Sequence, residues 1–273
     1  MRVGSDVPGR ITRLPGGVAM NIAMTLGRFG MTPALITAIG QDPSGDELLA
    51  DALDMGLVTD FVYRSDDLPT DVYMAVEGAN GLIAAIADAH SLEAAGAKIL
   101  APLSDGRLGS AEAPWSGSVA LDGNLTVELL REIARSSLFA QSDLRVAPAS
   151  PGKAERLLAL RDHPTATLYV NLEEAGILCQ REFSSSEDAA AALVARGTHR
   201  ALVTDGGDSA SDAVAGSVIT QKPPAVLVTR VTGAGDTFMA AHIASEISGL
   251  DRDAALTRAL QAAATYVSGE TPL

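Results

Sequence analysis

The chain has 273 residues and a formal net charge of −14, with no Lys/Arg-rich run to offset it. That charge argues against sequence-independent nucleic-acid binding and against binding to an anionic membrane surface. Hydrophobic residues make up 47% of the chain but aromatic residues only 4%, so Ala, Val, Leu and Ile must fill the interior, as in helices packed on a parallel sheet. The single cysteine, Cys179, excludes an internal disulfide and fits a reducing cytoplasm.

The first predicted element is an amphipathic helix over residues 18–29. Its apolar side chains recur at helical spacing, at Val18, Ile22, Leu26 and Phe29. The paired glycines Gly16 and Gly17 precede this helix, and Gly30 follows it in the position where a left-handed residue commonly ends a helix.

The rest of the chain alternates between strands and helices. Strands are predicted at residues 34–39, 119–121, 167–170, 201–204 and 225–229, and helices at 46–55, 128–134, 187–196, 237–247 and 254–267. Thr126 is expected to cap the helix at 128–134, and Ser184 with Glu187 to form a capping box at the start of 187–196. This alternation predicts an α/β fold with a mostly parallel central sheet.

One region departs from that alternation. Residues 72–76 and 82–87 are strand-like runs joined by Glu77-Gly78-Ala79-Asn80-Gly81, whose Asn-Gly pair is typical of a hairpin turn. An antiparallel hairpin does not belong inside a parallel sheet, so we expect a small lid beside it that excludes water from a reactive group. A surface hairpin without a gating role is the alternative.

The most informative stretch is Val231-Thr232-Gly233-Ala234-Gly235-Asp236, which joins the predicted strand 225–229 to the helix 237–247. Its glycines let the backbone turn tightly and bring N–H groups close to an anion, at the positive end of a helix dipole. A carboxylate there can take a proton from an attacking hydroxyl while the N–H groups stabilise a transferring phosphoryl group. The alternative is a plain strand-to-helix turn with Asp236 as a solvated helix-start residue.

Five motifs occur in an order that resembles the PfkB/ribokinase-like carbohydrate kinase family. They are Gly16-Gly17-Val18-Ala19-Met20-Asn21, Gly40-Gln41-Asp42-Pro43-Ser44-Gly45, Asn171-Leu172-Glu173-Glu174, Thr204-Asp205-Gly206-Gly207-Asp208 and Gly233-Ala234-Gly235-Asp236. The resemblance implies one ribokinase-like kinase domain over residues 1–273, with three α/β/α layers. It also implies a small β lid formed by about 60–90 with part of 5–15, and a chain that uses ATP and Mg²⁺.

The resemblance also assigns roles to particular residues. It implies that Asp236 is the catalytic base and that Gly233, Ala234 and Gly235 form the anion hole. It implies that Gly16, Gly17, Asn21 and Asp88 bind the substrate. Asn171, Glu174, Thr204, Gly206 and Gly207 would bind the nucleotide, with Glu174 holding Mg²⁺ through water. Carboxylates at the carboxyl ends of strands, where open α/β sheets bind ligands, suit that last role.

Within the family, the pattern is most similar to the pseudouridine kinases. The similarity lies in Pro8-Gly9-Arg10-Ile11, in the unbroken run from Gly16 to Ala23, and in Ile86-Ala87-Asp88. It implies that ATP phosphorylates the 5′-hydroxyl of a nucleoside, pseudouridine in particular. Ribose, fructose or a purine nucleoside are alternative substrates, and a truncated, catalytically dead ligand-binding relative is an alternative of another class.

Two departures from the family pattern stand out. The family opens with a hydrophobic strand that ends in a substrate-binding Asp, and residues 1–15 contain no such strand. Arg230 stands where the family has Asp or Asn, which leaves open whether a monovalent cation binds near the anion hole.

The predicted hairpin also has a bearing on assembly. It carries the apolar side chains Val72, Met74, Val76, Leu82 and Ile86. A hairpin with this many apolar side chains could pair with a second copy, so a homodimer through the lid is expected.

Overall fold

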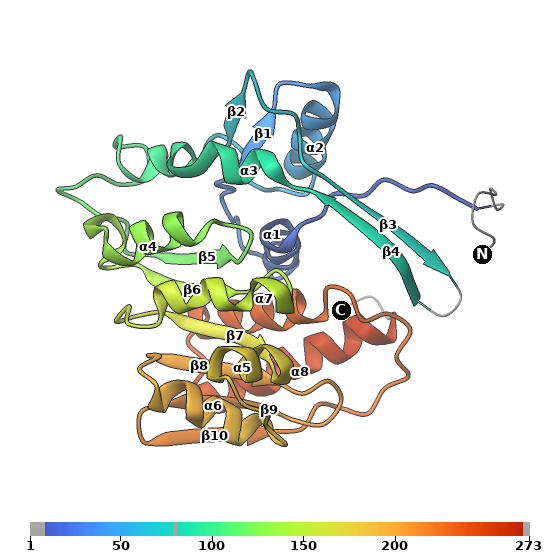
Figure 1. The fold of residues 1–273 in the computed structure, drawn as a ribbon, viewed down its shortest axis with the longest axis vertical. Helices are drawn as coiled ribbons and strands as arrows, with labels where there is room; N and C mark the ends of the chain where they lie inside the picture. The colour runs from blue at the N-terminus through green and yellow to red at the C-terminus, as the bar shows by residue number, and fades with distance from the viewer. Residues whose placement is uncertain (1–8, 79–80, 270–273) are drawn as a thin grey trace.

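The structure, a computed structural model, describes residues 9–78 and 81–269. Within them, a six-stranded central sheet has the order β10-β9-β8-β7-β6-β5 (Figure 1). Four neighbouring strands are parallel: β5 (Ser118–Asp122), β6 (Asp143–Ala147), β7 (Thr167–Asn171) and β8 (Arg200–Thr204). The antiparallel strands β9 (Ala210–Val214) and β10 (Ser217–Gln221) extend it. The prediction of an α/β fold with a mostly parallel sheet is confirmed.

Helices cover both faces of this sheet. One face packs against α4 (Val127–Arg135), the 3₁₀ segment η3 (Pro151–Leu160), α5 (Leu172–Cys179) and α6 (Ser186–Ala195). The other face packs against α1 (Val18–Arg28), α7 (Ala234–Ile247) and α8 (Arg252–Ser268). The molecule therefore has three α/β/α layers, as Figure 1 shows.

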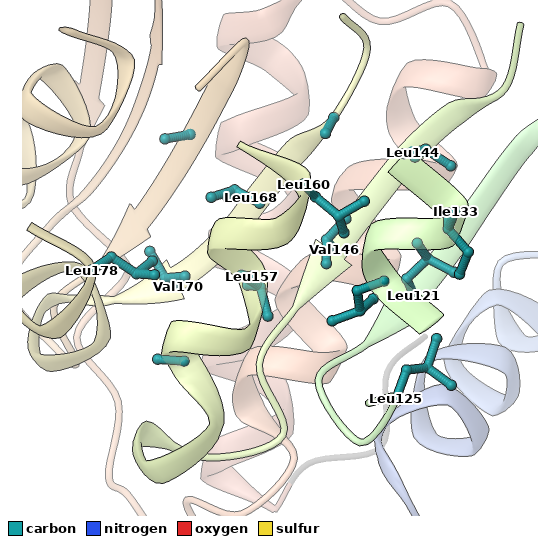
Figure 2. Close-up of a cluster of buried hydrophobic side chains, with 14 of the residues drawn as sticks. Leu121, Leu125, Ile133, Leu144, Val146, Leu157, Leu160, Leu168, Val170 and Leu178 are labelled. Atoms are coloured by element: carbon teal, nitrogen blue, oxygen red, sulfur yellow. The ribbon is translucent and has the colours of Figure 1, made fainter. Parts of the chain in front are cut away.

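Alternation along the strands explains why both faces are apolar. In β7, Leu168 and Val170 belong to the cluster under α4, η3 and α5, whereas Tyr169 between them belongs to the cluster under α7. Figure 2 shows the first cluster, in which Leu157 and Leu160 of η3 lie over the strand residues. Because successive side chains of a strand point to opposite faces, each parallel strand is buried on both sides.

A smaller unit packs on the other side of α1. It consists of the parallel pair β1 (Ala38–Gly40) and β2 (Tyr63–Ser65) with α2 (Pro43–Asp54). Apolar side chains of α1, including Met20 and Ala23, join those of α2 in a third buried cluster. Helix α1 thus lies between the small sheet and the layer formed by α7.

The turn before α2 is tightly packed. Asp42 caps α2, because its carboxylate accepts a hydrogen bond from Gly45 N at 2.7 Å. The same carboxylate accepts from N and Oγ1 of Thr70, both at 2.7 Å. A Cβ at Gly45 would lie 2.3 Å from the carbonyl oxygen of Gly40. The Gly-x-Asp-x-x-Gly motif is therefore a packing motif in this chain.

Gly45→Ala is expected to lower the free energy of unfolding by about 1–3 kcal/mol, the usual cost of forcing atoms into a packed site. Urea denaturation measures this. Gly152→Ala is the matched control, since a Cβ there meets no atom within 4 Å, and it should leave stability nearly unchanged. Equal stability of the two variants would contradict the packing argument.

The predicted hairpin is present. β3 (Val72–Gly78) and β4 (Gly81–Asp88) pair antiparallel, with Met74 opposite Ile86, and α3 (His90–Ala95) and the 3₁₀ segment η1 (Gly96–Leu103) follow. Figure 1 shows the pair projecting from the small sheet. Val72, Met74 and Ile86 are each more than half exposed. The predicted turn at 79–80 and the side chain of Leu82 lie outside the described residues.

Several predicted elements need correction. Residues 225–229 form no strand; they are exposed, and Thr229 N and Arg230 N donate to Val267 O of α8 instead. The strand expected at 34–39 is reduced to β1 and an isolated bridge between Ala34 and Val58. Ser185, and not Ser184, caps α6, because its hydroxyl accepts from Asp188 N at 3.1 Å. The described residues include no helix that is long and apolar enough to cross a membrane.

Candidate functional site

Polar residues gather at the carboxyl-terminal edge of the parallel strands. Asp122, Asn171 and Thr204 are the last residues of β5, β7 and β8. The register aligns them, since Asn171 is opposite Thr204 and Asp122 is opposite Ala147 at the end of β6. Ligands of open α/β sheets bind at this edge.

Two helices that are far apart in the sequence, α1 and α7, meet beside this edge. Gly17, with a φ of 98°, is the N-cap of α1, and its carbonyl accepts from Asn21 N at 2.8 Å. Asn21 therefore lies in the first turn of α1, directly after the paired glycines. Its Nδ2 donates to Oδ2 of Asp236 in the first turn of α7, at 2.8 Å. The early and the late motif of the sequence thus meet.

Two carboxyl groups in this region have raised pKa values. Burial raises the pKa of Asp236 to about 6; the hydrogen bond from Asn21 lowers it and the charge of Asp122 raises it further. Burial also raises the pKa of Asp122, whereas hydrogen bonds from Asn124 and from the N–H of Ala19, and the charge of Lys153, lower it. A carboxyl group with a pKa near 6 is well suited to accept a proton near neutral pH.

The glycine turn leaves N–H groups free beside Asp236. Gly233 is left-handed, with a φ of 88°, and precedes α7 as its N-cap. The N–H of Ala234 donates to Val231 O at 3.1 Å, and that of Thr237 donates to Gly233 O at 3.0 Å. The N–H groups of Gly235 and Asp236 have no acceptor in the described part of the chain. Of the predicted anion-hole donors, Gly235 is therefore free and Ala234 is engaged.

Asn171 and Glu174 form a capping box at the start of α5. Glu174 N donates to Oδ1 of Asn171 at 2.8 Å, and Asn171 N donates to Oε2 of Glu174 at 2.9 Å. Burial raises the pKa of Glu174, and the charge of Glu173 raises it further, whereas the hydrogen bond from Asn171 N lowers it. No cation pairs with Glu174 among residues 9–78 and 81–269. A nearby cation would offset part of the cost of burying this charge.

The glycine-rich turn after β8 is open. Gly206 has a φ of 51°, and a Cβ at Gly206 or Gly207 would meet no atom within 4 Å. Asp208 N donates to Asp205 O at 2.8 Å, which closes the turn into β9. The backbone here can approach a ligand closely, and Thr204 ends the strand beneath it.

Asp88 is not brought to the other predicted residues. It ends β4 opposite Val72, with an exposed side chain and no hydrogen bond to Asn21 or Asp236 in the described structure. Conversely, Asp122 and Lys153 were not predicted as site residues. Lys153, in η3 after β6, donates through Nζ to Oδ1 of Asn124 at 2.7 Å. Polar residues just after predicted strands were the signal that would have found Asp122.

Comparisons with known proteins identify the family of this chain. The model of the pfkB family carbohydrate kinases matches residues 3–271. A pseudouridine kinase of Escherichia coli K12 is 29% identical over 249 residues, which is 89% of this chain and 76% of that protein. The uncharacterized sugar kinase YeiI of the same organism is also 29% identical, over 96% of this chain and 72% of its own length.

Solved structures show the same fold. A carbohydrate kinase from Agrobacterium tumefaciens has a TM-score of 0.81 at 25% identity, covering 97% of this chain and 83% of its own. Ribokinase of Arabidopsis thaliana, complexed with ribose and ATP, has a TM-score of 0.77 at 21% identity, covering 97% and 86%. The chain therefore belongs to the pfkB family of carbohydrate kinases and is a sugar or nucleoside kinase.

Proposed function

We propose that this chain transfers the γ-phosphoryl group of ATP to the 5′-hydroxyl of a nucleoside, with pseudouridine as the preferred acceptor. The observation that carries the proposal is the hydrogen bond from Asn21 to Asp236. It joins the paired-glycine helix, where the sugar is expected, to the acid beside the glycine turn. The resemblance of the chain to a pseudouridine kinase at 29% identity supports the choice of acceptor.

Asp236 takes the proton of the attacking hydroxyl. Its pKa of about 6 keeps it ionised at neutral pH and close enough to neutrality to accept a proton in the transition state. The free N–H groups of Gly235 and Asp236, with the dipole of α7, stabilise the charge on the transferring phosphoryl group. Gly233 supplies the left-handed turn that aims these groups.

The nucleotide lies along the edge formed by β7 and β8. Its phosphates approach the open backbone at Gly206 and Gly207, next to Thr204. Asn171 and Glu174 fit a hydrated Mg²⁺, because a buried carboxyl without a cationic partner gains from a nearby dication. When bound, the ion would neutralise charge on the phosphates; the described residues hold no cluster of three His, Cys, Asp or Glu side chains that would coordinate it directly.

The nucleoside contacts Gly16, Gly17 and Asn21, and Asp122 offers a further buried acceptor at the same edge. The β3–β4 hairpin acts as the lid, which brings the exposed Asp88 toward the acceptor when it closes. The exposed side chains of Val72, Met74 and Ile86 support pairing of two lids in a homodimer.

A coupled ADP-release assay over pseudouridine, uridine, adenosine, ribose and fructose tests the proposal. The highest kcat/KM is expected with pseudouridine. A higher value with ribose, fructose or adenosine would assign another member of the family's substrate range. Nucleoside binding without any turnover would instead support a catalytically dead relative.

The fall of kcat/KM at acidic pH is expected to follow the protonation of Asp236. The kcat/KM of the unmodified chain should fall about tenfold for each pH unit below its pKa of about 6, since only the ionised carboxylate accepts the proton. Asn21→Ala removes a hydrogen bond that stabilises the charged form of Asp236, so the fall of kcat/KM in this variant should move to higher pH. Asp122→Asn removes a charge that repels the Asp236 carboxylate, so the fall of kcat/KM in this variant should move to lower pH. Identical pH profiles for the unmodified chain and both variants would contradict the assignment of this pKa to Asp236.

A further inference from the structure

The segment that leads into the glycine turn is attached to the last turn of α8. Thr229 N and Arg230 N both donate to Val267 O, at 2.8 and 3.2 Å. The hydroxyl of Tyr266 donates to Thr232 O at 2.9 Å. The backbone on both sides of Arg230 is therefore held by the carboxyl-terminal end of α8.

The side chain of Arg230 completes this attachment. Its Nε donates to Tyr266 O at 2.7 Å, and its guanidinium carbon lies 3.8 Å from the centroid of the Tyr266 ring. A cation is favoured at both places, because the carbonyl end of a helix and the face of an aromatic ring are electronegative.

Tyr266 in turn lies directly against the glycine turn. A Cβ at Gly233 would be 2.6 Å from the Tyr266 hydroxyl oxygen. Arg230, Tyr266 and Gly233 thus form one stack, and a shift of the ring would shift the backbone that precedes Gly235 and Asp236. The orientation of the free N–H groups depends on this stack.

A bound monovalent cation, which the family resemblance left open, does not fit here. Such an ion is held by backbone carbonyl and carboxylate oxygens. The carbonyl oxygens of Tyr266 and Val267 already accept from Arg230 and Thr229. The guanidinium itself offers only donors and carries a repelling positive charge.

We propose that the guanidinium of Arg230 is a built-in cation that holds the glycine turn, so that phosphoryl transfer by this chain needs neither K⁺ nor Na⁺. Arg230 is a positioning residue that acts through Tyr266, and it touches no reacting atom. The inference rests on the proposed kinase activity for its kinetic part only.

The kinetic experiment compares kcat with K⁺, Na⁺ or choline as the counter-ion at equal ionic strength. The unmodified chain should give the same kcat in all three. Arg230→Ala should lose about tenfold in kcat, the effect of removing one charge-assisted hydrogen bond, with KM for the nucleoside little changed. Arg230→Lys should recover part of the loss. Arg181→Ala removes another exposed arginine, 4.3 Å from the ring of Phe183, and should behave as the unmodified chain.

A second measurement does not depend on turnover. In Arg230→Asp, a carboxylate joins the released carbonyl oxygens, so K⁺ should raise the unfolding midpoint of this variant and not that of the unmodified chain. Stabilisation or several-fold activation of the unmodified chain by K⁺ would overturn the inference, as would a kcat of Arg230→Ala equal to that of Arg181→Ala. Absence of turnover with every acceptor would contradict the proposed function, while the midpoints still decide the role of Arg230.

Discussion

Replacing Asp236 by Asn should lower turnover by about two to four orders of magnitude, the range expected for loss of a positioned general base. The substitution keeps the shape of the side chain and an oxygen that can accept from Nδ2 of Asn21. Folding should therefore be intact, and KM for the nucleoside should change far less than kcat. Steady-state kinetics with the best acceptor measures both constants. Near-normal kcat would remove Asp236 from the mechanism.

The same substitution should stabilise the fold at alkaline pH. Burial raises the pKa of Asp236 in the folded chain to about 6, so the folded state binds the proton more tightly than the unfolded state. Stability is thus lost as pH rises from about 4 to 6, and above pH 6 the buried charge carries its full cost. Asp236→Asn should be more stable than the unmodified chain by about 1–2 kcal/mol at pH 8, and by much less at pH 4. Urea denaturation at both pH values checks the sign.

The second large effect concerns a buried ionic cluster at the opposite end of the strands. Asp212 of β9 is fully buried and accepts from Nε and Nη2 of Arg200 at 2.8 and 2.6 Å, and from Nε of Arg252 at 3.0 Å. Although burial raises the pKa of Asp212, the hydrogen bonds from Arg200 and Arg252 hold it below its usual range. Glu246 of α7 pairs with Arg200 and with Arg145. The cluster therefore links β6, β8 and β9 to α7.

Asp212→Ala is expected to lower the free energy of unfolding by about 3–5 kcal/mol, because it leaves the buried guanidinium of Arg200 without its bidentate partner. The matched control is Asp105→Ala, which breaks a bidentate pair with Arg107. The side chains of Asp105 and Arg107 are 40% and 49% exposed. That change should cost about 0–1 kcal/mol. Equal losses in the two variants, measured by urea denaturation, would show that burial does not decide the strength of this pair.

This cluster also explains why parts of the fold could not be predicted. β6 carries Asp143 and Arg145 between its apolar residues, and their pairing lets a charged segment form a buried strand, so it shows no continuous apolar run. Residues 225–229 are apolar but have no strand to pair with, and Leu227 is 81% exposed. Local pattern shows which residues can form a strand, whereas the presence of a partner strand depends on the tertiary fold.

The site divides in the same way. The glycine turn and the Asn171-Leu172-Glu173-Glu174 motif are local, and they were visible in the sequence, as was the order of the motifs. The 2.8 Å contact between Asn21 and Asp236 joins residues 215 positions apart, and its distance follows only from the packing of α1 on α7. Asp122 became visible for the same reason, once the strand register aligned it with that edge.

The same contact has a consequence for biosynthesis. Asn21 and Asp236 are 215 positions apart, so a ribosome-bound chain contains the amide long before the carboxyl group. No proteolytic or nascent fragment that ends before α7 can form this contact, however well its amino-terminal part has folded. The contact on which the proposed mechanism depends therefore forms only after α7 has been synthesised.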